Sequence, residues 1–457
     1  MGLFRRFRIR FIIYAILVYI TTHSLIVLLT RPGKLYFVVE LKHDTRYDIP
    51  TAENIPGEKQ RYNFCCRANT PVLKNPLKTK SYYRLSSSHE GDAPHMYIFS
   101  AHLDVENNVV DILGTGPTLQ LFEPVCVFVS GGHDPTSTTQ VAGTLQALHL
   151  HTYPKCNLDV ANLRPLYTTL AVHCPVPSTQ LVPSSLFIPP STLSPWTERI
   201  PVQYPAHHYR NFTVCYPAAH SDYANVEEMV QSMSINSILG AGKAFLYNHS
   251  IAPSMKPVMD YFIQCGQLEL VQARVPEPVV DGIHYYGQVV VMHDCLYRNR
   301  YTSKYILFQD MDEVVVPKKD SNWFTLIERL KNKYPKGGSF ALMNAFFTKT
   351  YQNGLSASMK DSHIKLLSYY SRHNIHDYLN RSKYFVIPRT VDILQVHGAL
   401  HMSDFHHVVV DVAEGLLHHY RSDIKDISLT VDRSVDRFSS QLTESIRNIM
   451  NCIRGPW

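Results

Sequence analysis

Strand-like and helical patterns of apolar residues alternate along the second half of the chain. Residues 212–216 are mostly β-branched or aromatic and predict a strand, whereas residues 226–239 place apolar side chains at helical spacing. The alternation continues with a strand at 243–247, a helix at 255–265, a strand at 268–273 and further elements at 286–292 and 305–308. Strands and helices that alternate with short connections predict an α/β fold, in which helices flank a mostly parallel sheet.

The first half of the chain has shorter apolar runs between Gly and Pro residues. Runs rich in β-branched and aromatic residues occur at 95–99, 109–113 and 125–129. They predict a small strand-rich subdomain over residues 81–174. Residues 175–205 contain eight prolines without periodicity and predict a linker or an extended segment. A larger domain over residues 206–425 and a helical tail over residues 426–457 would follow.

The most apolar stretch of the chain covers residues 11–30, which carry no formal charge and are bracketed by Arg10 and Arg31. A helix of this length spans roughly 30 Å, the hydrocarbon thickness of a bilayer. We expect a single-pass signal anchor, with a cleaved signal peptide or a buried helix as alternatives. Because ten residues cannot form a domain, residues 1–10 would be cytosolic and the body luminal. Residues 31–80 are polar and predict a stem.

Charge and cysteine usage fit a luminal body. The net charge is +6, but four arginines within the first ten residues supply most of it, and the nearly neutral remainder argues against nucleic-acid binding. All nine cysteines follow the apolar stretch, and an oxidising lumen would permit disulfides among them. Three N-x-S/T acceptors, at Asn211, Asn248 and Asn380, agree with this location.

A cluster of carboxylates directly follows the last strand of the alternating pattern. Asp310-Met311-Asp312-Glu313 stands between the apolar runs 305–308 and 314–316. Burying three carboxylates is costly unless a cation compensates them, and Asp310 and Asp312 share one face of an extended chain. Ligands bind beyond the carboxyl ends of parallel strands, and carboxylate oxygens suit Mg²⁺ or Mn²⁺. We therefore predict a divalent metal site here; the alternative is a solvated turn.

Several short motifs around this cluster resemble glycosyltransferase family 92. Residues 287–298 (GQVVVMHDCLYR), followed by YILFQDMDEVVVP, resemble the family's "G-Q…D-C-L-x-R" segment, strand and "D-x-D-E". Further on, residues 381–388 (RSKYFVIP) look like its "K-Y-I-V-R-P" stretch, with Ile387 in place of the arginine. Residues 396–397 and 419–421 match its "V-H" and "H-Y-R" signatures, and residues 97–101 resemble its opening strand. The resemblance covers roughly residues 95–421.

The resemblance implies a GT-A-type fold whose D-x-D motif holds Mn²⁺ against the diphosphate of a UDP-sugar donor. Members of the family transfer galactose from UDP-galactose in β linkage, with inversion. It thus implies a metal-dependent hexosyltransferase of the Golgi membrane, or elsewhere in the secretory pathway, that acts on a glycan acceptor. Two other functions stay open: a luminal sugar-binding protein that has a transferase fold without turnover, and a metal-dependent hydrolase.

The proposed chemistry assigns roles to a few polar residues. The metal, held by Asp310 and Asp312, would neutralise charge that develops on the departing diphosphate. Inversion requires a carboxylate that accepts the proton of the attacking hydroxyl, for which Asp377 and Asp404 are alternative candidates. Third metal ligands could be His397 or His419. Donor-binding candidates are Asp310, Asp294, Arg298 and Arg421, the arginines through bidentate contacts to phosphate oxygens. A structural or solvated role is the alternative for each residue outside the metal pair.

Overall fold

The structure is a computed structural model. It describes residues 26–31, 34–39, 83–84, 96–118, 123–130, 138–148, 166–177, 183–188, 199–206, 208–348, 364–402, 404–421 and 430–454. Contacts divide the chain into two units, Met1–Ile49 and Pro50–Trp457. In the first unit, β1 (Ile26–Arg31) pairs with β2 (Lys34–Val39) in an antiparallel hairpin.

This hairpin corrects part of the expected transmembrane helix. Residues 26–30 lie in β1, and the pairing begins at Arg31 and Lys34, which flank a Pro-Gly dipeptide of the kind common in turns. The β-branched Ile26 and Val27 also favour a strand. Residues 11–25 and most of the predicted stem lie outside the described residues. Among the described residues, no helix is both long and apolar enough to cross a membrane.

The first part of the second unit is a nine-stranded sheet with the order β7-β6-β10-β11-β4-β5-β9-β8, in which β3 also pairs with β4. The three predicted runs are strands here, so the strand-rich character of this region is confirmed. A disulfide joins Cys126 of β6 to Cys174 of β9. The strands are β3 (Tyr83–Arg84), β4 (Tyr97–Asp104), β5 (Val109–Pro117), β6 (Val125–Ser130), β7 (Thr138–Ala142), β8 (Thr144–Ala147) and β9 (Tyr167–Pro175).

The proline-rich segment contributes two of these nine strands. β10 (Pro183–Phe187) pairs with β6, and β11 (Ile200–Gln203) pairs in parallel with β4. Short strands tolerate proline where its missing N–H is not required, for example at the first residue, as Pro183 is here. The segment predicted as a linker is therefore in part a component of the N-terminal sheet. From β11 the chain continues directly toward the second sheet.

The second sheet has seven strands in the order β14-β13-β12-β15-β20-β17-β23. Six run in one direction and β20 runs opposite to them, which confirms the predicted α/β class with a mostly parallel sheet. Its strands are β12 (Arg210–Ala219), β13 (Lys243–Asn248), β14 (Leu268–Gln272), β15 (Ser303–Phe308), β17 (Gly337–Leu342), β20 (Lys383–Val386) and β23 (His406–Val410).

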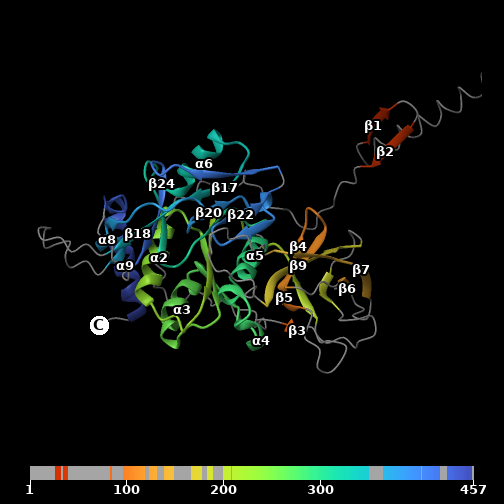
Figure 1. The fold of residues 1–457 in the computed structure, drawn as a ribbon, viewed down its shortest axis with the longest axis horizontal. Helices are drawn as coiled ribbons and strands as arrows, with labels where there is room; N and C mark the ends of the chain where they lie inside the picture. Colours follow the sequence, from red (N-terminus) through yellow and green to blue (C-terminus); the bar gives the residue numbers. More distant parts are fainter. Residues whose placement is uncertain are drawn as a thin grey trace, which may run out of the picture. The chain divides into compact units, whose positions relative to one another are not determined.

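Helices cover both faces of this sheet. One face packs against α2 (Val226–Leu239), α3 (Lys256–Gln264), α6 (Trp323–Lys333) and the C-terminal α9 (Ser439–Arg454). The other face packs against α5 (Gln288–Asn299), which also contacts β4 and β5 of the N-terminal sheet (Figure 1). Because α5 lies between two sheets, nearly all of its residues are buried. A disulfide from Cys295 to Cys215 of β12 fixes it in place.

A five-stranded sheet adjoins the carboxyl ends of the central strands. It has the order β16-β24-β18-β19-β25, and its first strand follows β15 after a short turn. The strands are β16 (Glu313–Pro317), β18 (Asn344–Thr348), β19 (Ser371–Arg372), β24 (Gly415–Tyr420) and β25 (Thr430–Val431). Since β16 pairs with β24 in antiparallel register, Glu313 lies opposite His419.

Candidate active site

The turn from β15 to β16 carries the predicted carboxylate cluster at the carboxyl edge of the seven-stranded sheet. The side chains of Asp310 and Asp312 are about one third exposed, at 34% and 27%, whereas Glu313 is buried at 1%. Glu313 accepts a hydrogen bond from the backbone N–H of Asp310 at 2.9 Å, which closes the turn. The carboxylates of the two aspartates are partly exposed, and each also faces a basic side chain, Lys383 or His419.

Lys383, the first residue of β20, supplies a cation to this cluster. Its Nζ lies 3.0 Å from Asp310 Oδ2 and 3.6 Å from Glu313 Oε2, and the side chain is only 3% exposed. Burial opposes the charge on Lys383, but the two carboxylates outweigh it and raise the pKa of the ammonium. Burial also raises the pKa of Glu313 to about 7, against the attraction of Lys383. The cation therefore compensates part of the cost of the buried acids.

His419 of β24 lies between the other two carboxylates. Its Nε2 is 3.2 Å from Asp312 Oδ2, and its Nδ1 is 3.2 Å from Glu313 Oε1. Burial lowers the pKa of His419, but the hydrogen bond to Asp312 and the nearby negative charges raise it further, so the net shift is upward. Each ring nitrogen of His419 thus faces one carboxylate, and its role as a metal ligand stays a prediction.

His397 has the protonation pattern of a metal ligand. Its Nδ1–H donates to the Ser382 carbonyl at 3.2 Å, which leaves Nε2 with its lone pair. Burial, aided by the charge of Lys383, lowers the pKa of His397 to about 4, so the ring is neutral at physiological pH. The charges of Lys383 and Asp310 both act on it. Its role as a metal ligand stays a prediction.

The residues of the cluster fit a divalent cation. Asp310 Oδ1 and Asn344 Oδ1 are buried side-chain oxygens without a hydrogen-bond partner in the described part of the chain. The described residues gather no group of three or more His, Cys, Asp or Glu side chains around one point. Mg²⁺ and Mn²⁺ bound with a nucleotide need only one or two carboxylates, because phosphate oxygens complete the coordination. Asp310 and Asp312 satisfy that requirement.

Aromatic rings at neighbouring strand ends form a second part of the edge, which the sequence patterns did not reveal. His220 follows β12, His249 follows β13, and both rings contact Tyr286, at centroid distances of 4.3 and 4.8 Å. Tyr285 and Tyr286 have positive φ angles of 43° and 55°, which are strained for residues other than glycine. Strain of this kind concentrates at functional sites. The sequence signal was weak, because a Tyr-Tyr-Gly segment also suits an ordinary turn.

Asp377 lies between β19 and β20, next to the rings that pack against His419. It follows His376, whose ring packs against Phe346 at 5.0 Å, and Phe346 in turn packs against His419 at 5.0 Å. The Asp377 side chain is exposed. Arg421 is also brought near, because the N–H of Tyr420 donates to the Asp312 carbonyl at 2.9 Å. The catalytic role of Asp377 and the donor-binding role of Arg421 stay predictions.

The sequence profile of Glycosyltransferase family 92 matches residues 210–451, from β12 into α9. That range is more than half of the 457 residues and includes the whole carboxylate cluster. The chain belongs to glycosyltransferase family 92. This match confirms the resemblance that the motifs around Asp310 indicated.

Two curated relatives match over short stretches. The Caenorhabditis elegans beta-1,4-galactosyltransferase galt-1 is 30% identical over 107 residues, which are 23% of this chain and 25% of the relative. The Arabidopsis thaliana galactan beta-1,4-galactosyltransferase GALS1 is 31% identical over 65 residues, 14% of this chain and 13% of the relative. The family 92 protein therefore matches a quarter or less of the length of these relatives.

Solved structures resemble the family 92 protein only distantly. Staphylococcus aureus TarS 1-349 in complex with UDP is 11% identical with a TM-score of 0.20, and the match covers 33% of this chain and 40% of that chain. Mycobacterium tuberculosis glucosyl-3-phosphoglycerate synthase in complex with Mn²⁺, UDP and glucosyl-3-phosphoglycerate is 11% identical with a TM-score of 0.24, covering 54% and 81%. TM-scores of this size support no conclusion about the family 92 protein.

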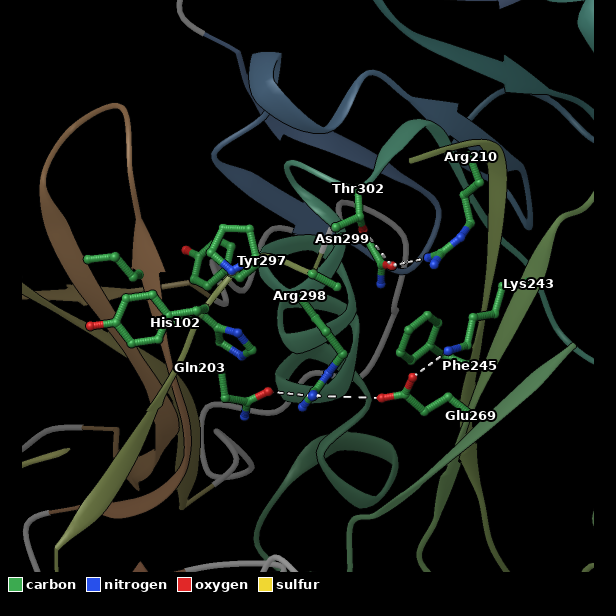
Figure 2. A pocket seen from close by; sticks show the side chains of 14 residues that line it. His102, Gln203, Arg210, Lys243, Phe245, Glu269, Tyr297, Arg298, Asn299 and Thr302 are labelled. Carbon is green, nitrogen blue, oxygen red and sulfur yellow. Dashed lines mark hydrogen bonds and ion pairs between the residues drawn. The ribbon is translucent and has the colours of Figure 1, made fainter. Parts of the chain in front are cut away.

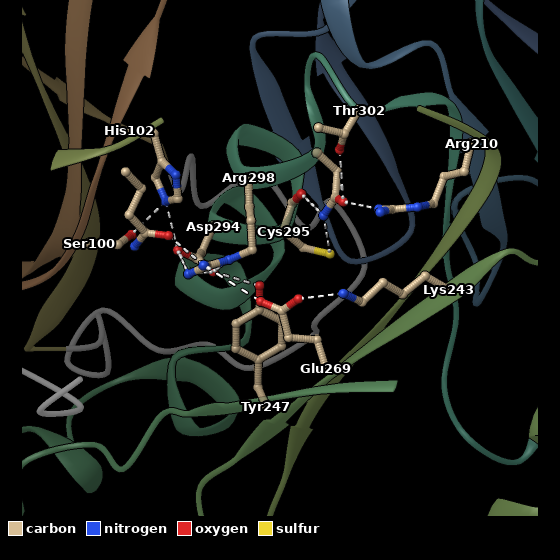
Figure 3. A network of polar contacts seen from close by, with 12 residues as sticks. Ser100, His102, Arg210, Lys243, Tyr247, Glu269, Asp294, Cys295, Arg298 and Thr302 are labelled. Carbon is tan, nitrogen blue, oxygen red and sulfur yellow. Dashed lines mark hydrogen bonds and ion pairs between the residues drawn. The ribbon is translucent and has the colours of Figure 1, made fainter. Parts of the chain in front are cut away.

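The structure places Asp294 and Arg298 away from the carboxylate edge, in a polar network of α5 (Figure 3). Asp294 is fully buried and accepts hydrogen bonds from His102 at 2.8 Å, Tyr247 at 2.6 Å and Arg298 at 3.1 Å. Burial opposes ionisation of Asp294, but Arg298 and the hydrogen bonds lower its pKa. All four oxygen lone-pair directions are thus largely used. In the family 92 protein these two residues join α5 to both sheets, and they do not meet the predicted donor-binding site.

Asp404 lies at the opposite edge of the seven-stranded sheet from Asp310. It precedes β23, whose first residue His406 pairs with Gly337 at the start of β17. β17 and β15 run in the same direction, so their first residues share the amino edge. A strand of six residues is on the order of 20 Å long. Of the two predicted bases, the structure therefore brings only Asp377 to the side of the sheet that carries the aspartates.

Proposed function

We propose that this family 92 protein is a metal-dependent galactosyltransferase that moves galactose from UDP-galactose to a glycan acceptor with inversion, on a GT-A-type catalytic domain. The single observation that carries the proposal is the pair Asp310 and Asp312 at the carboxyl edge of the sheet, inside the family match. Both curated relatives are named as β-1,4-galactosyltransferases, which supports galactose as the sugar.

The donor diphosphate would lie against Asp310 and Asp312. A divalent cation held there by these two carboxylates would supply positive charge against the leaving diphosphate. The nucleobase would then extend toward His220 and Tyr286, because those rings lie at the ends of the adjacent strands. Arg421 follows His419 by two residues, so its side chain starts on the same face of the strand and would contact a phosphate oxygen.

Other residues of the chain would position the carboxylates and accept the proton of the acceptor hydroxyl. Lys383 and His419 hold the carboxylates in place and limit their mutual repulsion. Asp377, exposed beside the Phe346 and His376 rings, would accept the proton of the attacking hydroxyl. An inverting reaction needs this base on the side of the sugar opposite to the departing diphosphate. Asp377 is favoured over Asp404 because Asp404 precedes β23 at the amino edge of the sheet.

We propose the Golgi lumen as the compartment, with the apolar segment that begins at Phe11 holding the protein at the membrane. The disulfides Cys126–Cys174 and Cys215–Cys295 support an oxidising environment. Protease treatment of intact microsomes should leave the body of the chain undigested. Digestion of the body without detergent would place it in the cytosol and refute this topology.

The decisive experiment compares wild type with Asp312→Asn across a Mn²⁺ titration, with UDP-galactose and a panel of glycan acceptors. The substitution keeps the shape but removes the charge that attracts the metal, so transfer should fall by roughly a factor of 10³ or more. Melting in chelator should stay near that of wild type, because Asp312 is partly exposed. Near wild-type transfer by the folded variant would remove the metal site from this position. Donor hydrolysis that no acceptor redirects would favour a hydrolase instead.

A further inference from the structure

A cavity of about 140 Å³ lies at the amino edge of the seven-stranded sheet (Figure 2). It is lined by residues at the starts of three adjacent strands: Arg210 of β12, Lys243 of β13 and Glu269 of β14. The last turn of α5 and the end of β11 complete the wall. A cavity of roughly 150 Å³ accommodates a benzene ring. The space therefore suits one six-membered ring.

The charges around the cavity are not balanced. Arg298 pairs with the buried Asp294 at 3.1 Å, and Lys243 pairs with Glu269 at 2.7 Å. Arg210 donates to the Asn299 side-chain oxygen at 3.2 Å, and among the described residues no carboxylate lies within ion-pair distance of it. Three cations thus face two carboxylates. The remaining donors of the Arg210 guanidinium are available to an anion.

The position of Arg210 makes this charge surplus costly. Burial lowers the pKa of the guanidinium, and the more distant charge of Glu269 only partly opposes the shift. Arg210 is half-buried, so an anion bound beside it would offset part of the desolvation that its guanidinium bears. The neighbouring Asn299 is 1% exposed and is itself held by the Cys295 carbonyl at 2.9 Å. The donors are therefore positioned before a ligand arrives.

The rest of the lining has the composition of a sugar site. Phe245 and Tyr297 provide apolar ring surface, and Gln203, Asn299 and Glu269 provide planar polar groups that can bond to hydroxyls. Arg298 is fixed by hydrogen bonds to both Asp294 and Gln203. Such a mixture of apolar ring surface and oriented polar groups matches the two faces and the hydroxyl rim of a pyranose.

We propose that this cavity binds an anionic monosaccharide, a single pyranose that carries a carboxylate or a phosphate, with the anionic group on Arg210. The cavity is separated from Asp310 by the length of the strands, on the order of 20 Å. It is therefore a second site, distinct from the one proposed for transfer. Binding here requires neither metal nor donor, so it can be tested independently of the transferase proposal.

The first experiment measures melting of the full-length protein in chelator with glucuronic acid, glucose 6-phosphate, galactose or inorganic phosphate. At about ten times the dissociation constant, an anionic sugar should raise the melting temperature by roughly 2 °C or more. Galactose should cause no shift at the same concentration. The two anionic sugars distinguish a carboxylate from a phosphate ligand. No shift with either sugar, an equal shift with galactose, or an equal shift with inorganic phosphate would overturn the proposal.

Three variants then locate the binding. Arg210→Gln should weaken binding of the active sugar at least about tenfold, because it removes a charge-assisted contact. Ala206→Trp, at an exposed residue of the cavity wall, should block entry without removing a charge, and it decides the matter if Arg210→Gln does not fold. Lys304→Gln is the matched control, since Lys304 near the start of β15 pairs with Glu328 and does not line the cavity. Wild-type affinity in both cavity variants would overturn the proposal.

Discussion

Asp377 and Asp404 are both exposed aspartates, and their difference lies in the edge of the sheet that each one occupies. Asp377 adjoins the rings that pack against His419, whereas Asp404 precedes β23 at the amino edge. A base must lie within hydrogen-bond reach of the hydroxyl that it deprotonates. Geometry alone therefore separates two residues that composition and spacing could not.

We expect Asp377→Asn to lower transfer at least about a hundredfold, because general-base catalysis contributes roughly 10²–10⁴. The asparagine cannot accept the proton, but an exposed position should leave the melting temperature unchanged. Asp404→Asn is the matched control and should retain wild-type turnover. The measurement is the initial rate at saturating donor and acceptor. Equal rates for the two variants would exclude Asp377 as the base.

His293 of α5 should make the stability of the fold depend on pH. Its Nδ1–H donates to the Val289 carbonyl at 2.8 Å, and its Nε2 accepts from the Leu394 N–H at 3.0 Å. Burial lowers the pKa of His293 to about 4. Because the folded pKa lies below the ordinary value of 6.5, the neutral ring favours the folded state above pH 6.5, and this contribution is lost as the pH falls toward 4.

When the pH falls from 7 to 5, protonation linked to His293 should therefore lower the free energy of unfolding by roughly 2 kcal/mol. Denaturant titrations at the two pH values measure the loss. His293→Gln, which cannot titrate, should reduce the pH dependence by about this amount, whereas His401→Gln at an exposed site should not. An unchanged pH dependence in His293→Gln would assign the acid sensitivity to other groups.

The acidic half of the candidate site could be predicted from the sequence, because Asp310 and Asp312 are only two residues apart and follow an obvious strand. The cationic half could not. Lys383 and His419 come from strands far along the chain, and only the pairing of β15 with β20 and of β16 with β24 brings them to the carboxylates. Asp294 and Arg298 show the opposite case. They lie in a motif that the sequence reveals, but α5 carries them between the two sheets and away from Asp310.

At the scale of elements, β20 stabilises the site by delivering Lys383 across from β15. Lys383→Met should destabilise the fold by about 3–5 kcal/mol at pH 8, since it leaves Asp310 and Glu313 without their buried partner. The loss should be smaller at pH 5, where Glu313, whose pKa burial raises to about 7, takes up a proton. Thermal and denaturant unfolding at both pH values test this.

The control for that experiment lies on β15 itself. Lys304 pairs with Glu328 at 2.9 Å, but both side chains are substantially exposed. Lys304→Met should therefore cost less than about 1 kcal/mol and show no such pH dependence. If Lys383→Met and Lys304→Met lost the same stability, the buried ion pairs of Lys383 would stabilise the fold no more than the exposed pair of Lys304 does.

Two helices show how far elements could be predicted. The helix predicted at 226–239 is α2 with the same bounds, because helical spacing coincides with a cap: the Asn225 side chain accepts from the Glu228 N–H. The element at 286–292 could not be assigned, since its valine run suits either a strand or a buried helix. In the structure most of this segment belongs to the helix α5, whose contacts with two sheets explain why its apolar residues show no single face. The proline-rich segment was predicted as a linker or an extended segment, and its strands β10 and β11 are extended; they could not be located because short strands leave no period.

At the scale of the whole molecule, a secreted form that begins at Ser81 should fold and bind UDP-galactose with wild-type affinity. It retains β3, which pairs with β4, and every later element. It omits residues predicted as a stem, which carry no core-forming pattern. Calorimetric titration of the donor in Mn²⁺ measures the affinity. Aggregation of this form beside a soluble form that begins at Arg31 would move the boundary toward the N-terminus.

Arg300, just past the end of α5, lies 2.5 Å from Asp104 of β4 and 3.2 Å from Asp111 of β5. These carboxylates precede the residues that the family profile matches, which start at residue 210, yet they neutralise a cation on the segment that leads into β15. Inherited variation at Asp104 or Asp111 would therefore remove one of the two carboxylates that neutralise Arg300 without altering any residue of the candidate site. We expect such a variant to accumulate at a lower level because it is less stable. The molecules that do fold should keep the specificity of the wild type.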